Sequence, residues 1–168
     1  MPGATSVTSL TSGETPPDGS GQTISRGLIC GAMGILKALE FIAQNHKAVL
    51  ATTRSDGSPQ LSLIAAGVDG DNKVVVSTRE AAMKTKNLRQ RPRASLLVFT
   101  DAFYGEWVQV DGRVEVVPLP EAIDGLIDYY RQIGGEHPDW DEYRAAMNHE
   151  RRVLLRMTVD RAGPDKAG

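Results

Sequence analysis

The spacing of apolar residues changes several times along the chain, and each change predicts a different element. After Met33, apolar residues recur every three or four positions, at Ile35, Leu36, Leu39 and Ile42, which predicts an amphipathic helix. Later apolar runs are short and rich in valine, which is typical of strands. The predicted strands are 48–53, 60–68, 73–78, 94–100, 107–119 and 151–159. Further helices are predicted over about 81–90, over 120–134 and over 139–148.

Turn and cap signals join these elements. The Asp-Gly pair at 56–57 and the turn at 69–72 lie between apolar runs, which predicts an antiparallel meander of the first three strands. Gly112 interrupts a long strand, where we expect a bulge or bend. Pro120 suits the first turn of a helix, and Asp139 is a candidate N-cap. About six strands, mostly joined by hairpins, and about four helices indicate a mainly β fold with α: a small closed antiparallel barrel with helices outside.

Composition excludes several classes of protein. The 19 lysines and arginines are opposed by 21 aspartates and glutamates, a net charge of −2, whereas nucleic-acid-binding domains are strongly basic. The single cysteine excludes an internal disulfide and favours a reducing, cytoplasmic location. No apolar run reaches the roughly 20 residues that span a bilayer, so no membrane partner is expected. Residues 1–25, rich in Ser, Thr, Gly and Pro, are expected to form a disordered tail before one domain at 26–168.

The familiar signatures of catalytic and metal sites are missing from the sequence. It contains no Walker loop, no G-x-S-x-G elbow and no G-x-G-x-x-G motif. The three histidines lack metal-binding spacing, and His46 is interpreted as a C-terminal cap of the first helix. We therefore predict no catalytic residue and no metal ligand, and we expect a cofactor to carry any chemistry.

A basic segment, 79–93, is the strongest local signal of a binding site. It holds six basic residues and a single acid, Glu80. On a helix, Lys84, Asn87 and Leu88 share one face and Lys86 falls on another, which disfavours one flat patch for duplex DNA. The segment follows directly after a strand, and the free backbone N–H groups at such a junction suit a phosphate. These residues alone leave two alternatives open, a phosphate pocket around Lys84 and a solvated basic face.

Three motifs, in order and at consistent spacing, resemble one protein family. They are LATTRSDGSPQ at 50–60, STREAAMKTKNLRQRPRAS at 77–95 and VQVDG at 108–112. Together they resemble the pyridoxamine 5′-phosphate oxidase-like family of FMN-binding split barrels, over about residues 36–159. The segment 126–155 resembles the actinobacterial branch of that family that uses the deazaflavin coenzyme F420. The resemblance implies a six-stranded antiparallel split β-barrel with peripheral helices, and a homodimer that holds the cofactor between its chains.

The resemblance also implies which residues hold the cofactor. Its phosphate would lie near Lys84 and the strand end at 77–78, and its ring and linker would lie along 59–62. The implied cofactor-binding residues are Pro59, Gln60, Leu61, Ser62, Ser77, Thr78, Met83, Lys84, Lys86, Asn87 and Trp107. Trp107 would reach the groove from the partner subunit. The chain departs from close relatives at Ala82, where they often carry arginine, so either phosphate binding is weaker or Lys86 or Arg79 compensates for the missing charge.

The activity that the resemblance implies is that of an F420-dependent reductase. Reduced coenzyme F420 would deliver a hydride to a small electron-poor acceptor, such as a conjugated lactone, a quinone, a nitro compound or a tetrapyrrole. Two alternatives stay open. One is an FMN-binding pyridoxamine 5′-phosphate oxidase-like protein or flavin reductase, and the other is a carrier that binds F420 without catalysis. No nucleic acid is expected as a partner.

Overall fold

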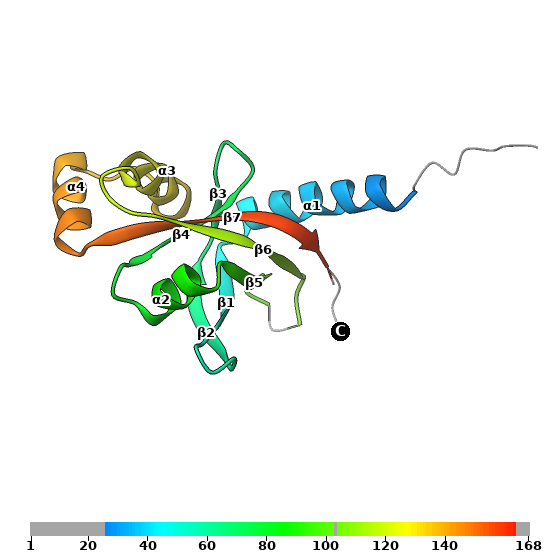
Figure 1. Cartoon of the computed structure of the whole chain (residues 1–168). Helices are drawn as coiled ribbons and strands as arrows, with labels where there is room; N and C mark the ends of the chain where they lie inside the picture. The colour runs from blue at the N-terminus through cyan, green and yellow to red at the C-terminus, as the bar shows by residue number, and fades with distance from the viewer. Residues whose placement is uncertain (1–25, 103, 164–168) are drawn as a thin grey trace, which may run out of the picture.

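The computed structural model describes residues 26–102 and 104–163, with side chains from residue 34 onward. Figure 1 shows the arrangement of its helices and strands. Their order is α1 (Arg26–Gln44), β1 (Lys47–Thr53), β2 (Pro59–Ala65), β3 (Gly67–Val68), β4 (Val74–Arg79), α2 (Met83–Gln90), β5 (Arg93–Phe99), β6 (Trp107–Val117), α3 (Ile123–Gly134), α4 (Trp140–His149) and β7 (Arg152–Ala162). None of the described helices combines the length and apolarity that crossing a membrane would require. The predicted tail, 1–25, lies outside the described residues.

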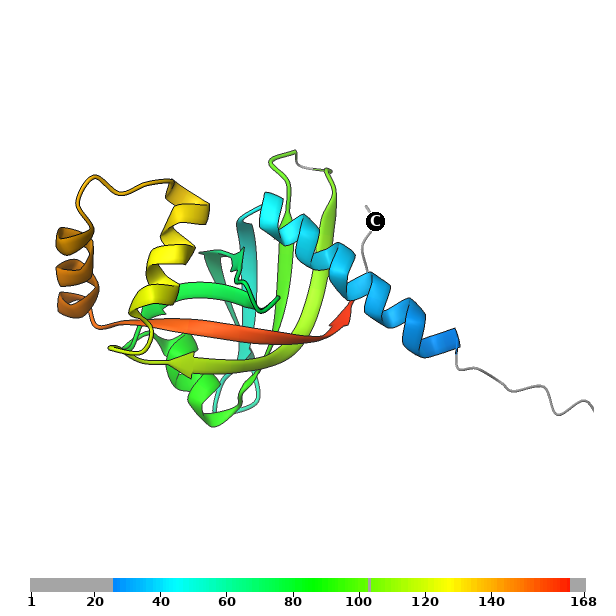
Figure 2. The same cartoon turned by 90° about the horizontal axis from the view of Figure 1, so that it is seen from above.

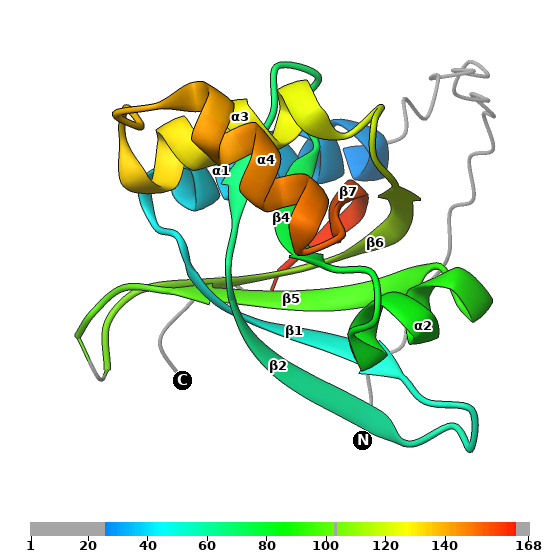
Figure 3. The same cartoon turned by 90° about the vertical axis from the view of Figure 1, so that its left-hand side faces the viewer.

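The strands form one antiparallel sheet in the order β2-β1-β5-β6-β7-β4-β3. Its edge strands, β2 and β3, follow each other directly in the chain, so the sheet must curl until its two edges meet (Figure 3). Helices lie outside this curled sheet (Figures 1 and 2). The predicted mainly β fold, an antiparallel split barrel with peripheral helices, is confirmed, with seven strands in place of six.

The additional strand arises because the predicted strand 60–68 is broken at Ala66. Its first part, β2, pairs with β1 along its whole length, whereas its last two residues, β3, pair with β4. The predicted meander is wrong in this respect, since the middle strand connects opposite edges of the barrel. Apolar periodicity does not reveal such a break, because barrel closure and not the local pattern decides which neighbour each half meets.

The barrel interior forms the main core, and α1 and α2 each add side chains to it. Leu50, Leu96 and Val110 point inward from their strands and are almost wholly buried. Ile42 of α1 and Leu88 of α2 are equally buried in the same cluster. Burying a side chain of this size contributes about 1.5–3 kcal/mol. The inward faces of α1 and α2 are therefore fixed by the core.

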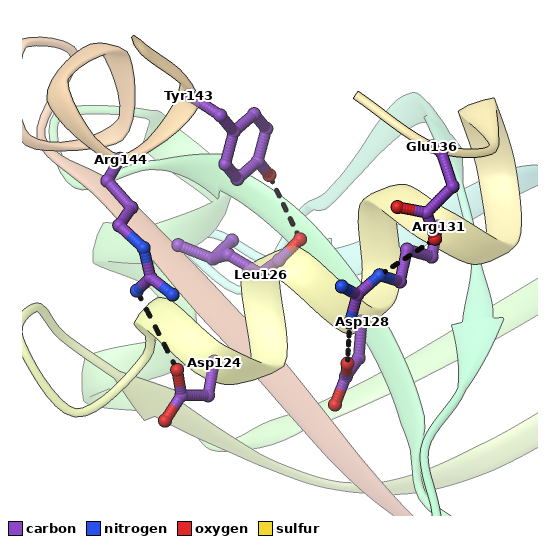
Figure 4. A network of polar contacts seen from close by, with 7 residues as sticks. All are labelled: Asp124, Leu126, Asp128, Arg131, Glu136, Tyr143 and Arg144. Atoms are coloured by element: carbon purple, nitrogen blue, oxygen red, sulfur yellow. Dashed lines mark hydrogen bonds and ion pairs between the residues drawn. The ribbon is translucent and has the colours of Figure 1, made fainter. Parts of the chain in front are cut away.

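A second apolar layer lies outside the barrel, where α3 and α4 cover β4 and β7 (Figures 1 and 2). Val75 of β4 and Leu154 of β7 pack there against Leu126 and Tyr143. Polar contacts join the two helices (Figure 4). The Tyr143 hydroxyl donates to the Leu126 carbonyl at 2.9 Å, and Arg144 lies 3.8 Å from Asp124. This layer ties the C-terminal helices to the barrel.

The Tyr143 hydroxyl predicts how stability falls at high pH. Burial raises its pKa to about 12 from an ordinary value of 10.0. Because the pKa of this hydroxyl is higher in the folded than in the unfolded protein, its contribution to stability is complete below pH 10. The contribution is lost as the pH rises from 10 to about 12. Two pKa units correspond to about 3 kcal/mol. In urea titrations, Tyr143→Phe is expected to lose about 2 kcal/mol less than the parent between pH 10 and 12, because part of each titration falls outside this range. An equal loss of unfolding free energy in the parent and in Tyr143→Phe would contradict this role of the hydroxyl.

Two local predictions are confirmed. The Asp139 carboxylate accepts hydrogen bonds from two backbone N–H groups in the first turn of α4, which confirms the N-cap. The register between β6 and β7 shifts at Gly112, which confirms the bulge. A Cβ at Gly112 would lie 2.1 Å from the Thr158 carbonyl oxygen, so the two backbones approach too closely for any side chain.

Two other local predictions are wrong. Pro120 does not open α3, which begins at Ile123, because residues 118–122 first form a turn after β6. His46 does not cap α1, because the Asn45 amide already donates to the last turn at the Phe41 carbonyl. The His46 ring bonds instead to the Ala66 carbonyl, at the strand break.

Candidate cofactor site

Helix α2 turns one face into the barrel and the other to solvent. Asn87 and Leu88 are buried, Lys84 is half-buried and Lys86 is exposed. This confirms the predicted division of the basic segment between two faces. The polar residues that the helix turns inward are therefore the ones that can build a site.

Asn87 links α2 to the strands that the sequence analysis singled out. Its side-chain amide donates to the Thr52 hydroxyl at 3.1 Å and to the Gln60 side-chain oxygen at 2.9 Å. Thr52 and Gln60 are directly paired across β1 and β2, so the three side chains form one cluster. The structure thus brings together two implied cofactor residues, Gln60 and Asn87, that are far apart in the sequence. We call Thr52, Gln60 and Asn87 the amide cluster.

Removing the Asn87 side chain is expected to destabilise the protein. Asn87 is 5% exposed and Thr52 is 2% exposed, so Asn87→Ala leaves buried polar groups without their partner. Such a loss costs about 2 kcal/mol. The free energy of unfolding from urea titration measures it. Asn148→Ala is a matched control, because the exposed Asn148 amide donates only to the Arg144 carbonyl. Equal losses in the two variants would contradict the buried role of Asn87.

The N-terminus of α2 has the features of an anion site. Ala82 stands at the N-cap, no side chain caps the helix, and its first turn contains no acid. The N-terminal N–H groups of a helix carry partial positive charge and favour an anion. Lys84 lies in this first turn, and none of the ion pairs among the described residues includes it. A phosphate therefore fits the residues present.

Most other cations of the basic segment already have partners. Arg79, Arg89 and Arg93 form ion pairs at 3.2, 3.1 and 2.9 Å with Glu150, Glu80 and Asp160. Arg91 donates to the Ser55 carbonyl. Arg79 thus already pairs with Glu150, whereas Lys86, which takes part in no ion pair among the described residues, lies on the exposed face of α2.

The residues along β2 alternate between the two faces of the sheet. Gln60 and Ser62 lie opposite the inward-facing Thr52 and Leu50, so they share the inner face. Pro59 and Leu61 lie on the outer face, and Leu61 is 67% exposed. The implied cofactor residues on this strand therefore lie on two faces of the sheet, and of the two on the inner face only Gln60 belongs to the amide cluster.

The same division separates Ser77 from Thr78. Thr78 is buried and pairs with Val153, which belongs to the barrel core, whereas Ser77 pairs with Leu154, under α3 and α4. Their side chains point to opposite faces of β4, so the structure does not bring the two hydroxyls together. Met83, at the start of α2, is exposed.

Trp107 lies far from the amide cluster within one chain. It begins β6 and pairs with Phe99, whereas the Thr52 end of β1 lies beside Ser95. The distance from Ser95 to Phe99 along β5 is about 13 Å, from the rise of roughly 3.3 Å per residue. Trp107 of the same chain is therefore not part of this cluster.

The outer face of the sheet is apolar and carries a polar hollow. Leu61 and Leu63 of β2 are 67% and 83% exposed, and Leu97 of β5 is 36% exposed. The hollow, of about 570 Å³, is lined by residues that include Pro59, Ser95 and Asp111. Burial opposes ionisation of Asp111, but hydrogen bonds from Ser95 and Arg161 outweigh it and lower its pKa. The Asp111 carboxylate is thus charged at neutral pH.

Sequence reasoning missed Thr52 as a member of the site. The signal was present, because Thr52 continues the inward-facing series of Ala48 and Leu50 in β1. A hydroxyl at a core position requires a hydrogen-bond partner, and Asn87 is that partner. No group of three histidine, cysteine or carboxylate side chains in the described residues could hold a metal ion.

Comparison with known proteins agrees with this fold. The model of the family described as pyridoxamine 5′-phosphate oxidase matches residues 37–163. An F420-dependent biliverdin reductase of Mycobacterium tuberculosis is 25% identical over 124 residues, which cover 74% of this chain and 82% of that protein. A conserved hypothetical protein of M. tuberculosis has a similar structure, with a TM-score of 0.64, 25% identity, and coverage of 76% of this chain and 81% of the other.

The structure of an F420 reductase is also similar, with a TM-score of 0.59 and 21% identity over 74% of this chain and 94% of that chain. At this identity the likeness concerns the fold alone. The family match is broader evidence, since it covers most of the chain, from within α1 to the end of β7. The chain therefore belongs to the pyridoxamine 5′-phosphate oxidase family.

Proposed function

We propose that the protein is an F420-dependent oxidoreductase that reduces a small electron-poor acceptor. The observation that carries this proposal is the 25% identity, over 124 residues, with a protein named F420-dependent biliverdin reductase. The α2 N-terminus with Lys84 supports it, because the coenzyme requires an anion site and these residues fit one. When bound, reduced F420 supplies the hydride.

The residues of the chain would bind and orient the coenzyme. Lys84 and the first N–H groups of α2 hold its phosphate, and the amide cluster fixes the position of α2 against β2. The proton that completes the reduction comes from solvent, since no side chain in the amide cluster is an acid. Catalysis then rests on the orientation of the coenzyme and the acceptor.

The complete site is proposed to need two chains. Trp107 lies about 13 Å along the sheet from the Thr52 end of β1, so it would reach the coenzyme bound by another copy. The outer face formed by β2, β1 and β5 supports this, because Leu61, Leu63 and Leu97 expose apolar surface there that a second copy could bury. No described helix covers this face in Figure 3. A homodimer joined through it would place Trp107 of the partner subunit near β2.

A paired titration tests the cofactor. Coenzyme F420 and FMN are each titrated into the purified protein, with cofactor fluorescence as the measurement. F420 is expected to bind more tightly than FMN, and tighter binding of FMN would overturn the proposal in favour of a flavoprotein. Turnover with reduced F420 and biliverdin, a quinone, a nitro compound or a conjugated lactone then separates a reductase from a carrier. Binding without turnover of any acceptor class would favour the carrier.

A further inference from the structure

The break at Ala66 leaves a seam between β2 and β4. These strands contact each other, yet β4 pairs only with β3 and β7, and β2 pairs only with β1. Backbone groups that face such a seam lack the ladder of hydrogen bonds that a continuous sheet would give them. Their partners must come from elsewhere.

Helix α3 supplies the first of these partners through Tyr129. The Tyr129 hydroxyl donates to the Ala65 carbonyl, the last residue of β2, at 3.0 Å. Helix α3 thus holds the end of β2 that lies at the seam. Burial raises the Tyr129 pKa, so the hydroxyl keeps its proton at neutral pH and remains a donor.

Gln132, one turn further along α3, holds the other side of the break. Its side-chain oxygen accepts from the Val68 N–H at 3.0 Å. A Cβ at Gly67 would lie 2.7 Å from this oxygen, so the glycine is what allows the amide to approach the backbone. Tyr129 and Gln132 therefore form hydrogen bonds with the backbone on both sides of Ala66.

His46, which directly precedes β1, forms the hydrogen bonds of Ala66 itself. Its Nδ1 lies 2.8 Å from the Ala66 carbonyl and donates to it, and its own carbonyl accepts from the Ala66 N–H at 2.8 Å. Ala66 is fully buried, so water does not compete for these groups. Each residue from Ala65 to Val68 except Gly67 thus has a hydrogen bond to α3 or to His46.

We infer that Tyr129 and Gln132 are positioning residues, through which α3 sets the position of β2 and so of the cofactor-binding segment 59–62. This inference rests on the proposed function. Ser62 lies only three residues before the Ala65 carbonyl that Tyr129 holds, and β2 has no strand on its other edge. The turn after β1 fixes one end of this edge strand and α3 fixes the other. The residues of β2 between these two ends therefore have little freedom to move.

Hydrogen exchange tests the positioning without any cofactor. Tyr129→Phe removes one hydroxyl and keeps the ring, and the amides of β2 are expected to exchange about tenfold faster, as the loss of one buried hydrogen bond implies. The amides of β5 are expected to stay unchanged. Tyr130→Phe, at the next position of α3, is the matched control, since its ring packs on Trp140 and Tyr143 and not on the seam. Unchanged exchange of β2 in Tyr129→Phe would overturn the inference.

Titration with F420 tests the consequence for the site. Tyr129→Phe is expected to bind F420 about five- to tenfold more weakly, whereas Tyr130→Phe is expected to bind it as the parent does. Gln132→Leu is expected to weaken binding similarly, and Gln132→Glu, which keeps an acceptor oxygen, to restore it. Failure of the parent to bind F420 would count against the proposed function alone, because the exchange experiment is independent of it. Parent-like binding by both Tyr129→Phe and Gln132→Leu would count against the positioning role.

Discussion

Lys84→Ala is expected to weaken F420 binding by roughly ten- to a hundredfold, the loss of one charge-assisted hydrogen bond to a phosphate. Lys84 is the half-buried cation of the first turn of α2, with no acid in that turn to neutralise it. Fluorescence titration of both proteins at one fixed ionic strength gives the ratio of dissociation constants. The fixed ionic strength matters because salt screens any interaction of a partly exposed charge.

The control for Lys84→Ala must remove the same charge elsewhere. Lys73→Ala does so, because Lys73 lies in the turn before β4, at the opposite end of that strand from α2. It is expected to bind F420 within about twofold of the parent, since one distant surface charge is largely screened. If the two variants weakened binding equally, the effect would come from total charge, and the phosphate would have to lie away from α2.

If the proposed homodimer forms through the outer face, Leu63→Glu is expected to leave the protein monomeric. Leu63 is 83% exposed in one chain and lies on the outer face with Leu61 and Leu97. In a symmetric dimer the substitution occurs twice, so it removes two buried leucines, each worth about 1.5–3 kcal/mol, and adds two charges to an apolar interface. Light scattering after size exclusion should give twice the chain mass of 18.1 kDa for the parent and a single chain mass for the variant.

Leu36→Glu provides the comparison for this experiment. Leu36 is a leucine of α1 that is 52% exposed and lies outside the β2–β1–β5 face. This variant is expected to keep the mass of the parent. A parent protein of single chain mass, or a Leu63→Glu variant that stays dimeric, would exclude the outer face as the interface. F420 binding by Leu63→Glu should also fall, because the proposed dimer is what would bring Trp107 of the partner subunit to the coenzyme.

Some parts of the site could be predicted from sequence because they depend on local geometry. The helical spacing of Lys84, Asn87 and Leu88 placed them on one face, and the structure confirms this with Asn87 and Leu88 buried. The bulge at Gly112 followed from a glycine within a long apolar strand. Helix periodicity and glycine geometry are properties of a few neighbouring residues, so a single sequence contains them.

Other parts depend on which segments meet, and local patterns do not determine that. The contact of Asn87 with Thr52 and Gln60 joins three elements, and no spacing in the sequence indicates it. The break at Ala66 follows from closure of the barrel, so the segment 60–68 was predicted as one strand. The opposite directions of the Ser77 and Thr78 hydroxyls follow from the alternation of a strand, which sequence reasoning could have applied.

The position of β7 in the sheet has a consequence for the order of folding. β7 follows every other element of the described chain, yet it lies between β6 and β4 and pairs with both. Before β7 leaves the ribosome, β2-β1-β5-β6 and β4-β3 are two separate sets of strands, joined by the chain at Ala66 and through α2 but by no strand pairing. Domains fold during synthesis as their segments become available, and contacts distant in sequence form last. The barrel, and with it the shape of the site at α2, can therefore form only when the C-terminal strand has been made.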